Sequence, residues 1–155
     1  MTPVHATGDF SYRCRRLSGE RWLLAGDAAG FIDPVWSSGV YLAILSGEKA
    51  ADALDRVLRR PELKAREFGR YERRVHRVMD LYLKFVTAWY TPAFAEVFFH
   101  PQEFLRLVPA VNSILAGDDR ELFEVRWRLW LFDRLVWLQH KFGLIAPRLT
   151  LEPRH

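Results

Sequence analysis

The stretch from Leu24 to Val40 constrains the fold more than any other, because it joins an apolar segment to a helix through a loop of glycine, aspartate, proline and serine. The apolar run from Trp22 to Ala25 is too short for a helix and predicts a buried strand. Gly26 and Asp27 end that strand. Glycine allows a close backbone approach or a positive φ, and a carboxylate accepts hydrogen bonds from groups such as sugar hydroxyls. The strand end is therefore a polar ligand site in outline.

The second half of the same stretch predicts the N-terminus of a helix. Pro34 fixes one backbone angle, Ser37 and Ser38 are favoured N-cap residues, and an apolar helical pattern begins at Val40. Unpaired N–H groups at a helix N-terminus, together with the positive end of the helix dipole, attract an anion or a carbonyl oxygen. For the Gly-Asp pair alone, an ordinary connection between a strand and a helix is the simpler interpretation.

The complete stretch resembles the second flavin-binding motif of FAD-dependent monooxygenases, and its part from Asp33 to Val40 resembles that of the tryptophan-type flavin-dependent halogenases. The resemblance covers about residues 10–118 and implies that Asp27 holds the ribityl chain of FAD. It also implies that the loop after the proline approaches the isoalloxazine ring and binds a halide through its amides. Many members have threonine at the position of Ser38. The implied cofactor-binding residues are Gly26, Asp27, Ala28, Pro34, Gly39 and Val40, and the implied halide-binding residues are Ser38 and Gly39.

The activity that the resemblance implies is that of an oxidoreductase. Reduced FAD activates oxygen, and a halide held at Ser38 and Gly39 is oxidised to hypohalous acid for an electron-rich substrate. A flavin reductase is the implied partner, and no catalytic residue is identified. Two other interpretations remain open. One is a flavin monooxygenase that hydroxylates without halogenating, and the other is a non-catalytic helical module that binds a protein partner or a membrane surface.

Signatures of a complete enzyme of this kind are absent from the sequence. There is no Gly-x-Gly-x-x-Gly turn for the FAD pyrophosphate, and no Trp-x-Trp-x-Ile-Pro string with its active-site lysine. We therefore expect the C-terminal part of an α/β, Rossmann-like FAD-binding monooxygenase fold, inactive alone, with a separate or missing N-terminal flavin-binding half. Residues 1–60 are expected to be the last piece of the FAD-binding domain, and residues 61–155 a helical region.

Outside the loop the chain is expected to be mainly helical. Phe10 to Leu17 alternates in part and predicts a strand beside Trp22–Ala25. One amphipathic helix is predicted from Ser38 to the residue before Pro61, and a second from Pro61 to Trp89. The second has an arginine face that is interpreted as solvated, with phosphate binding as the alternative. The charged residues of that face and its neighbourhood are Glu67, Arg70, Glu72, Arg73, Arg74 and Arg77.

The C-terminal part predicts an aromatic tract at 85–109, a short helix from Pro109 to Leu115 and a last helix at about 120–142. The last helix is apolar around most of its circumference, which indicates burial against a missing domain or contact with a membrane surface. Its narrow polar stripe consists of Arg126, Asp133 and His140. The tail after Gly143 is expected to be irregular.

The composition argues against several other classes. The single cysteine, Cys14, excludes an internal disulfide and fits a reducing cytoplasm, which is the expected location. The five histidines lack the spacing of metal ligands, so no metal is expected. A net charge of +4 from dispersed arginines gives no reason to expect a nucleic-acid partner. The sequence shows neither a signal peptide nor an apolar run of the ~18 residues that span a membrane.

Overall fold

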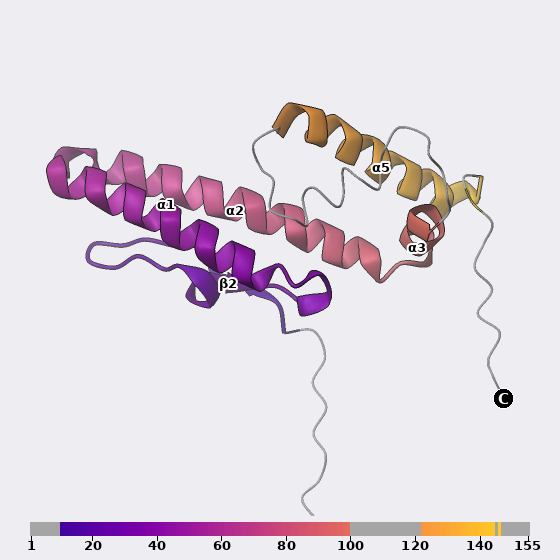
Figure 1. Cartoon of the computed structure of the whole chain (residues 1–155), viewed down its shortest axis with the longest axis horizontal. Coiled ribbons are helices and arrows are strands. Elements are labelled where there is room, and N and C mark those ends of the chain that lie inside the picture. Colours follow the sequence, from indigo (N-terminus) through magenta and orange to yellow (C-terminus); the bar gives the residue numbers. More distant parts are fainter. Residues whose placement is uncertain (1–9, 100–121, 145, 147–155) are drawn as a thin grey trace, which may run out of the picture. The chain divides into compact units, whose positions relative to one another are not determined.

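The computed structural model describes residues 10–99, 122–144 and 146 (Figure 1). Internal contacts divide the chain into two compact units, one ending at Val86 and the other beginning at Thr87. The described residues are mainly helical, and the first unit also holds a sheet of two short strands. The mainly helical character predicted with a short β segment is confirmed. The predicted division at residue 60 refers to the domains of a longer flavoprotein and stays a prediction.

The sheet of the first unit belongs to a hairpin formed by residues 12–31. Strand β1 (Tyr12–Arg13) pairs antiparallel with β2 (Gly30–Phe31), with Tyr12 opposite Phe31. The predicted strand at Trp22–Ala25 is wrong, because only Leu23 pairs there, in an isolated bridge to Ser18. The bridge consists of two hydrogen bonds, from the Gly19 N–H to the Trp22 carbonyl at 2.9 Å and from the Leu24 N–H to the Leu17 carbonyl at 2.8 Å.

Two antiparallel helices make up most of the first unit. Helix α1 (Gly39–Arg59) and helix α2 (Lys64–Trp89) are joined by the 3-10 turn η3 (Pro61–Leu63), and they run side by side (Figure 1). Arg56 and Glu67 meet at 3.2 Å near the turn, and the rings of Tyr41 and Tyr82 lie 5.8 Å apart further along. Both predicted helices are therefore confirmed. Most of the predicted apolar face of α2 is buried. Tyr71, Val75, Val78, Tyr82 and Phe85 are each less than a tenth exposed, while Trp89, at the end of the helix, is half-buried.

A polar stripe on α2 holds the hairpin. Glu72, His76 and Asp80 follow one another at a spacing of four residues, so they share one face of the helix. The Glu72 carboxylate accepts three hydrogen bonds of 2.8–2.9 Å. The partners of the stripe are the Leu17 and Ser18 N–H groups and the Ser18 hydroxyl for Glu72, the Cys14 carbonyl for His76, and the Arg13 guanidinium for Asp80. The hairpin is thus fixed along α2 from its turn to β1.

The interpretation of the arginine face of α2 needs one correction. Arg70, Arg73 and Arg77 are exposed as predicted, while Arg74 is half-buried. Glu67, however, is only 4% exposed, because Arg56 reaches it from α1 while Arg70 reaches it from the next turn of α2. Glu67 is therefore part of the contact between the two helices and not part of a solvated surface.

The second unit packs helix α3 (Pro92–Phe99) against helix α5 (Leu122–Phe142). Phe94 is fully buried, and its ring meets that of Phe132 edge-on at 5.2 Å. Buried Gln139 donates to the Glu96 carboxylate at 2.5 Å, and it exchanges hydrogen bonds of 2.8 and 3.0 Å with the backbone of Ala146. A polar side chain outside the predicted stripe therefore ties this unit together.

The predicted last helix is confirmed by α5, but its apolar surface is not buried all round within the part of the chain that the structure describes. Trp127, Trp130 and Trp137 are 38%, 60% and 48% exposed. The predicted helix from Pro109 to Leu115 and most of the tail lie outside the described residues. None of the described helices combines the length and hydropathy needed to cross a membrane.

Candidate flavin and halide loop

The first half of the loop is anchored on α1. Residues Gly26–Ala28 form a 3-10 turn, η1, that starts with Gly26 at φ +58°, in the region that favours glycine. The Gly26 N–H donates to the hydroxyl of Ser46 on α1 at 2.8 Å. Ser46 is fully buried, and its hydroxyl donates to the Leu42 carbonyl at 2.7 Å. The Ser46 hydroxyl thus joins the first N–H group of the turn to a backbone carbonyl of α1.

Asp27 presents its carboxylate to the outside at this anchored turn. The residue is exposed, and its carboxylate has no hydrogen-bond or ion-pair partner among the described residues. Its backbone is held, because the Tyr12 hydroxyl donates to the Asp27 carbonyl at 2.5 Å. A fixed backbone and an uncommitted carboxylate suit the binding of hydroxyl groups.

The second half of the loop is a tight turn with a residue of positive φ. The Asp33 carboxylate accepts from the Val35 N–H at 3.0 Å and starts a second 3-10 turn, η2 (Pro34–Trp36). The Asp33 N–H donates to the Ser11 hydroxyl at 2.9 Å. Ser37 follows at φ +50°, which is uncommon for a residue other than glycine and places the next two residues at the start of α1. Capping here therefore belongs to Asp33, which the sequence had not indicated.

Ser38 occupies the N-cap position of α1, as predicted, but its side chain does not cap the helix. Ser38 precedes the first residue of α1 and its carbonyl accepts the first helical hydrogen bond from Leu42 at 2.9 Å, but its hydroxyl caps nothing. That hydroxyl is buried, with the residue 2% exposed, and has no hydrogen-bond partner among the described residues. A buried hydroxyl without a partner costs free energy unless a ligand or water supplies one. Ser38 is the group in the loop that most requires an outside partner.

The first turn of α1 is open at Gly39, the residue after Ser38. A Cβ added to Gly39 would meet no described atom within 4 Å, so packing of the chain itself does not demand glycine there. The N–H groups of Gly39 and Val40 precede the first helical hydrogen bond and can donate to an acceptor. Val40 is 72% exposed. The N-terminus of α1 can thus be approached closely by a ligand.

The two halves of the loop meet on the first turns of α1. A Cβ built on Gly26 would lie 3.6 Å from the Cβ of Ala43, which is one helical turn from Gly39. One turn of α-helix rises only ~5.4 Å, so the Gly26–Ala28 turn lies close to the helix N-terminus. The structure therefore brings the Gly26–Ala28 turn close to Ser38 and Gly39 at the start of α1.

The sequence did not indicate that Ser46 and Tyr71 support the loop. Tyr71 donates its hydroxyl hydrogen bond to the Leu24 carbonyl just before the loop, and burial, with the nearby Glu72 carboxylate, raises the pKa of Tyr71 to about 12. Burial also acts to raise the pKa of Glu72. The hydrogen bonds from Ser18 and Leu17, together with His76, outweigh it and lower that pKa below its ordinary value. No sequence signal marks Ser46 or Tyr71, since each lies in an ordinary helical pattern.

Comparison with known proteins gives the class of this chain. Residues 13–100, which include the complete loop, match the model of the tryptophan halogenase family. Because that match covers more than half of the chain, the chain belongs to the tryptophan halogenase family. The resemblance seen in the loop sequence is confirmed, and so are the terms oxidoreductase, flavoprotein and halogenase for the group to which the chain is related.

Individual relatives agree with the family assignment. The flavin-dependent halogenase armH4 of Armillaria mellea is 44% identical over 69 residues, which are 43% of this chain and 13% of that protein. A chlorinase of 1H-pyrrole-2-carbonyl peptidyl-carrier protein from Pseudomonas fluorescens is 30% identical over 90 residues, 58% of this chain and 20% of that protein. The sulochrin halogenase gedL of Aspergillus terreus is 36% identical over 121 residues, 78% of this chain and 19% of that protein. The chain thus spans a fifth or less of each of these relatives.

Proposed function

We propose that this chain is the C-terminal portion of a flavin-dependent halogenase and supplies the ribityl, isoalloxazine and halide contacts. In this proposal residues 1–60 are the last piece of a Rossmann-like FAD-binding domain, and residues 61–155 form its helical region. The remaining flavin contacts come from an N-terminal half, and a flavin reductase supplies reduced FAD. The chain is proposed to be inactive alone. The family match and the small share of each relative that the chain covers support this reading.

The observation that carries the proposal is the unpartnered polar groups of the loop. The Asp27 carboxylate is exposed and the Ser38 hydroxyl is buried, and neither has a partner among the described residues. The open space at Gly39 lies next to Ser38. Loops rarely leave a buried hydroxyl without a partner. These three features fit a cofactor with sugar-like hydroxyls and a small anion beside it.

The roles of the residues follow from this geometry. Asp27 accepts hydrogen bonds from the ribityl hydroxyls of FAD, while Gly26 and Ala28 hold the backbone of the turn around it. Pro34, Gly39 and Val40 form the backbone wall for the isoalloxazine ring. The backbone N–H groups of Ser38 and Gly39 bind the halide at the positive end of the α1 dipole. The bound FAD supplies the oxygen chemistry that oxidises the halide.

Titration with FAD tests the proposal in two formats. In the first, FAD is added to the whole chain, and in the second to the chain mixed with the part of the Pseudomonas fluorescens chlorinase that precedes its aligned residues. We expect flavin absorbance and fluorescence to change saturably in the mixture, and chloride to perturb the bound flavin. Absence of flavin binding in both formats would contradict the proposal.

A further inference from the structure

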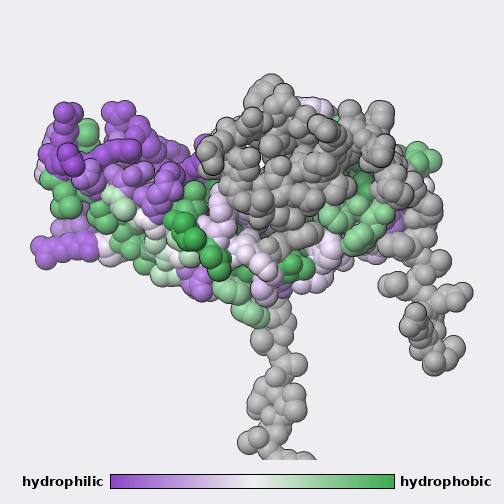
Figure 2. All heavy atoms as spheres, viewed as in Figure 1, coloured by the Kyte–Doolittle hydropathy of each residue, from purple (hydrophilic) through white to green (hydrophobic). Residues whose placement is uncertain are grey.

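The positive charge of the chain is concentrated where α1 leads into α2. Residues 49–77 contain ten lysines and arginines and five aspartates and glutamates, a net charge of +5, whereas the whole chain carries +4. In Figure 2, hydrophilic side chains gather over the left-hand end of the molecule, where α1 ends and α2 begins. The arginines that look dispersed along the sequence thus share one end of the helix pair.

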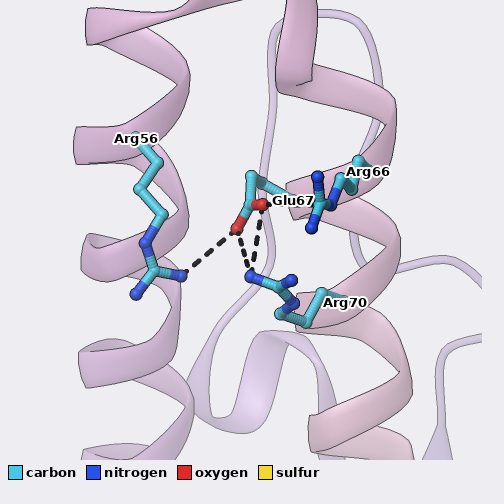
Figure 3. A network of polar contacts seen from close by, with 4 residues as sticks. All are labelled: Arg56, Arg66, Glu67 and Arg70. Atoms are coloured by element: carbon cyan, nitrogen blue, oxygen red, sulfur yellow. Dashed lines mark hydrogen bonds and ion pairs between the residues drawn. The ribbon is translucent and has the colours of Figure 1, made fainter.

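Glu67 organises the centre of this basic region. Figure 3 shows Arg56 reaching Glu67 from α1 and Arg70 reaching it from α2. The Arg56 Nη1 atom lies 3.2 Å from one carboxylate oxygen, and the Arg70 Nη1 atom lies 3.1 and 3.2 Å from the two oxygens. Glu67 is nearly fully buried, so it acts as a fixed acceptor that holds two guanidinium groups in place.

A hollow of about 350 Å³ lies between α1 and α2 over this network. Its charged lining consists of Lys49, Asp52, Arg56, Glu67, Arg70 and Arg74. Four positive charges therefore face two negative ones, and one of the two, Glu67, is already paired. The hollow keeps a surplus of positive charge inside a partly enclosed space, where electrostatic attraction is stronger than in open water.

We propose that this hollow is a binding site for a phosphate group. Arg56 and Arg70 each use a single nitrogen for Glu67, and a guanidinium carries five N–H donors, so most of their donors remain for a ligand. Their side chains are 49% and 52% exposed, so solvent and ligands reach them. Guanidinium groups pair with phosphate oxygens through two parallel hydrogen bonds. Lys49, which lies on α1 with Arg56 and pairs with the exposed Glu48 at 2.7 Å, adds a point charge to the lining. The site is separate from the loop and does not rest on the proposed flavin function.

Glu67 fixes the positions of the arginines but reduces the net positive charge of the hollow. Its carboxylate orders the arginines, but its negative charge repels a phosphate. Replacing it with glutamine keeps an oxygen acceptor for the arginines while raising the charge of the hollow by one. Binding that becomes tighter in Glu67→Gln is therefore a signature of an anion in this hollow, because a contact made elsewhere on the surface would not respond.

The test uses the whole chain and inorganic phosphate, with binding measured by isothermal titration calorimetry. We expect saturable binding of one phosphate, weakened about three- to tenfold by Lys49→Gln and tightened about threefold by Glu67→Gln. The matched control is Arg59→Gln, which removes the same charge from α1 at a residue paired with Asp55 outside the hollow. Its phosphate affinity should stay within about twofold of the unmodified chain.

Two further arms identify the source of the phosphate group. Glycerol phosphate and vesicles containing phosphatidylglycerol replace inorganic phosphate. Tighter binding of the soluble ester than of inorganic phosphate assigns the site to a small phosphate ester, and saturable binding of free phosphate with stronger vesicle binding assigns it to a lipid headgroup. The proposal is overturned if free phosphate does not bind, even where vesicles do. It is overturned equally if Lys49→Gln and Arg59→Gln weaken binding alike.

Discussion

Two glycines of the loop region serve opposite purposes. A Cβ on Gly30 would lie 2.8 Å from the Tyr12 carbonyl oxygen and 3.2 Å from the terminal methyl carbon of Met79, so the pairing of β2 with β1 requires glycine. A Cβ on Gly39 would meet no described atom within 4 Å. The first glycine is demanded by the fold, whereas packing of the described residues does not require the second.

Gly30→Ala should therefore destabilise the chain. The added methyl group clashes with backbone that α2 holds in place, and overpacking of this kind costs ~1–3 kcal/mol in the free energy of unfolding. Denaturant unfolding measures the change. Gly47→Ala is the matched control, because a Cβ at Gly47 would meet no described atom within 4 Å. Alanine favours a helix over glycine by ~0.5–1 kcal/mol, so this variant should not be destabilised. If the two variants were equally stable, the backbone around Gly30 would have to move to accept the methyl group at no cost in stability.

Gly39→Ala should separate folding from binding. The variant is expected to unfold at the same or a slightly higher denaturant concentration, since alanine favours the first turn of α1. The flavin-reconstituted protein is the chain mixed with FAD and the chlorinase segment described above. In this protein the added methyl group occupies the open space at Gly39, so chloride should perturb the flavin spectrum less. An unchanged chloride response in this variant would remove Gly39 from the proposed halide site.

Among the elements, α2 holds the hairpin that leads into the loop. Glu72, His76 and Asp80 hold the hairpin, and Tyr71 contacts the Leu24 carbonyl where the loop begins. The helix itself was predictable from the spacing of its apolar residues. The polar stripe was not, because its partners are backbone and side-chain groups more than fifty residues earlier in the sequence, and spacing along one helix does not reveal them.

The lowered pKa of Glu72 predicts an acid-dependent loss of stability. Since its pKa is lower in the folded chain than the ordinary value of 4.5, Glu72 stabilises the fold fully above pH 4.5, and this contribution disappears as the pH falls through the folded-state pKa. Glu72→Gln should be less stable near neutral pH but lose less stability on acidification. Unfolding curves at several pH values measure this, and parallel pH profiles for both proteins would contradict it.

The elements also differ in how far the sequence predicts them. The amphipathic pattern and Pro61 marked both ends of α1 and the start of the next helix, so long periodic elements were found. The two-residue strand at Gly30–Phe31 was missed because such a segment has no period, while the apolar run at Trp22–Ala25 suggested a strand that is a single bridge. Burial of Glu67 was missed because its partner Arg56 lies on another helix.

At the scale of the whole molecule, α1 carries an apolar stripe that the described residues leave exposed. Val40, Ile44 and Leu58 are 72%, 67% and 80% exposed, and Leu54 lies on the same stripe. Contiguous exposed apolar patches on a protein surface can mark interaction surfaces. The stripe begins at the proposed flavin loop, which agrees with a proposed N-terminal flavin-binding half lying against α1.

The loop was the part of the site that the sequence predicted best. Its residues lie next to one another in the chain, so their grouping needed no knowledge of tertiary contacts. The supports of the loop could not be foreseen, since Ser46 and Tyr71 reach it from two helices. The orphan hydroxyl of Ser38 likewise appears only in three dimensions, because its residue type alone suggested a cap.

The affinity of the flavin-reconstituted protein for FAD, compared between Asp27→Ala and Asp55→Ala, tests the central claim most directly. Both variants remove one exposed carboxylate, but Asp55 pairs with Arg59 on the outer surface of α1, away from the loop. We predict that Asp27→Ala weakens FAD binding about ten- to a hundredfold, as expected for hydrogen bonds to a charged acceptor, and that Asp55→Ala leaves it unchanged. Equal FAD affinity in the two variants would contradict the assignment of this loop to the flavin.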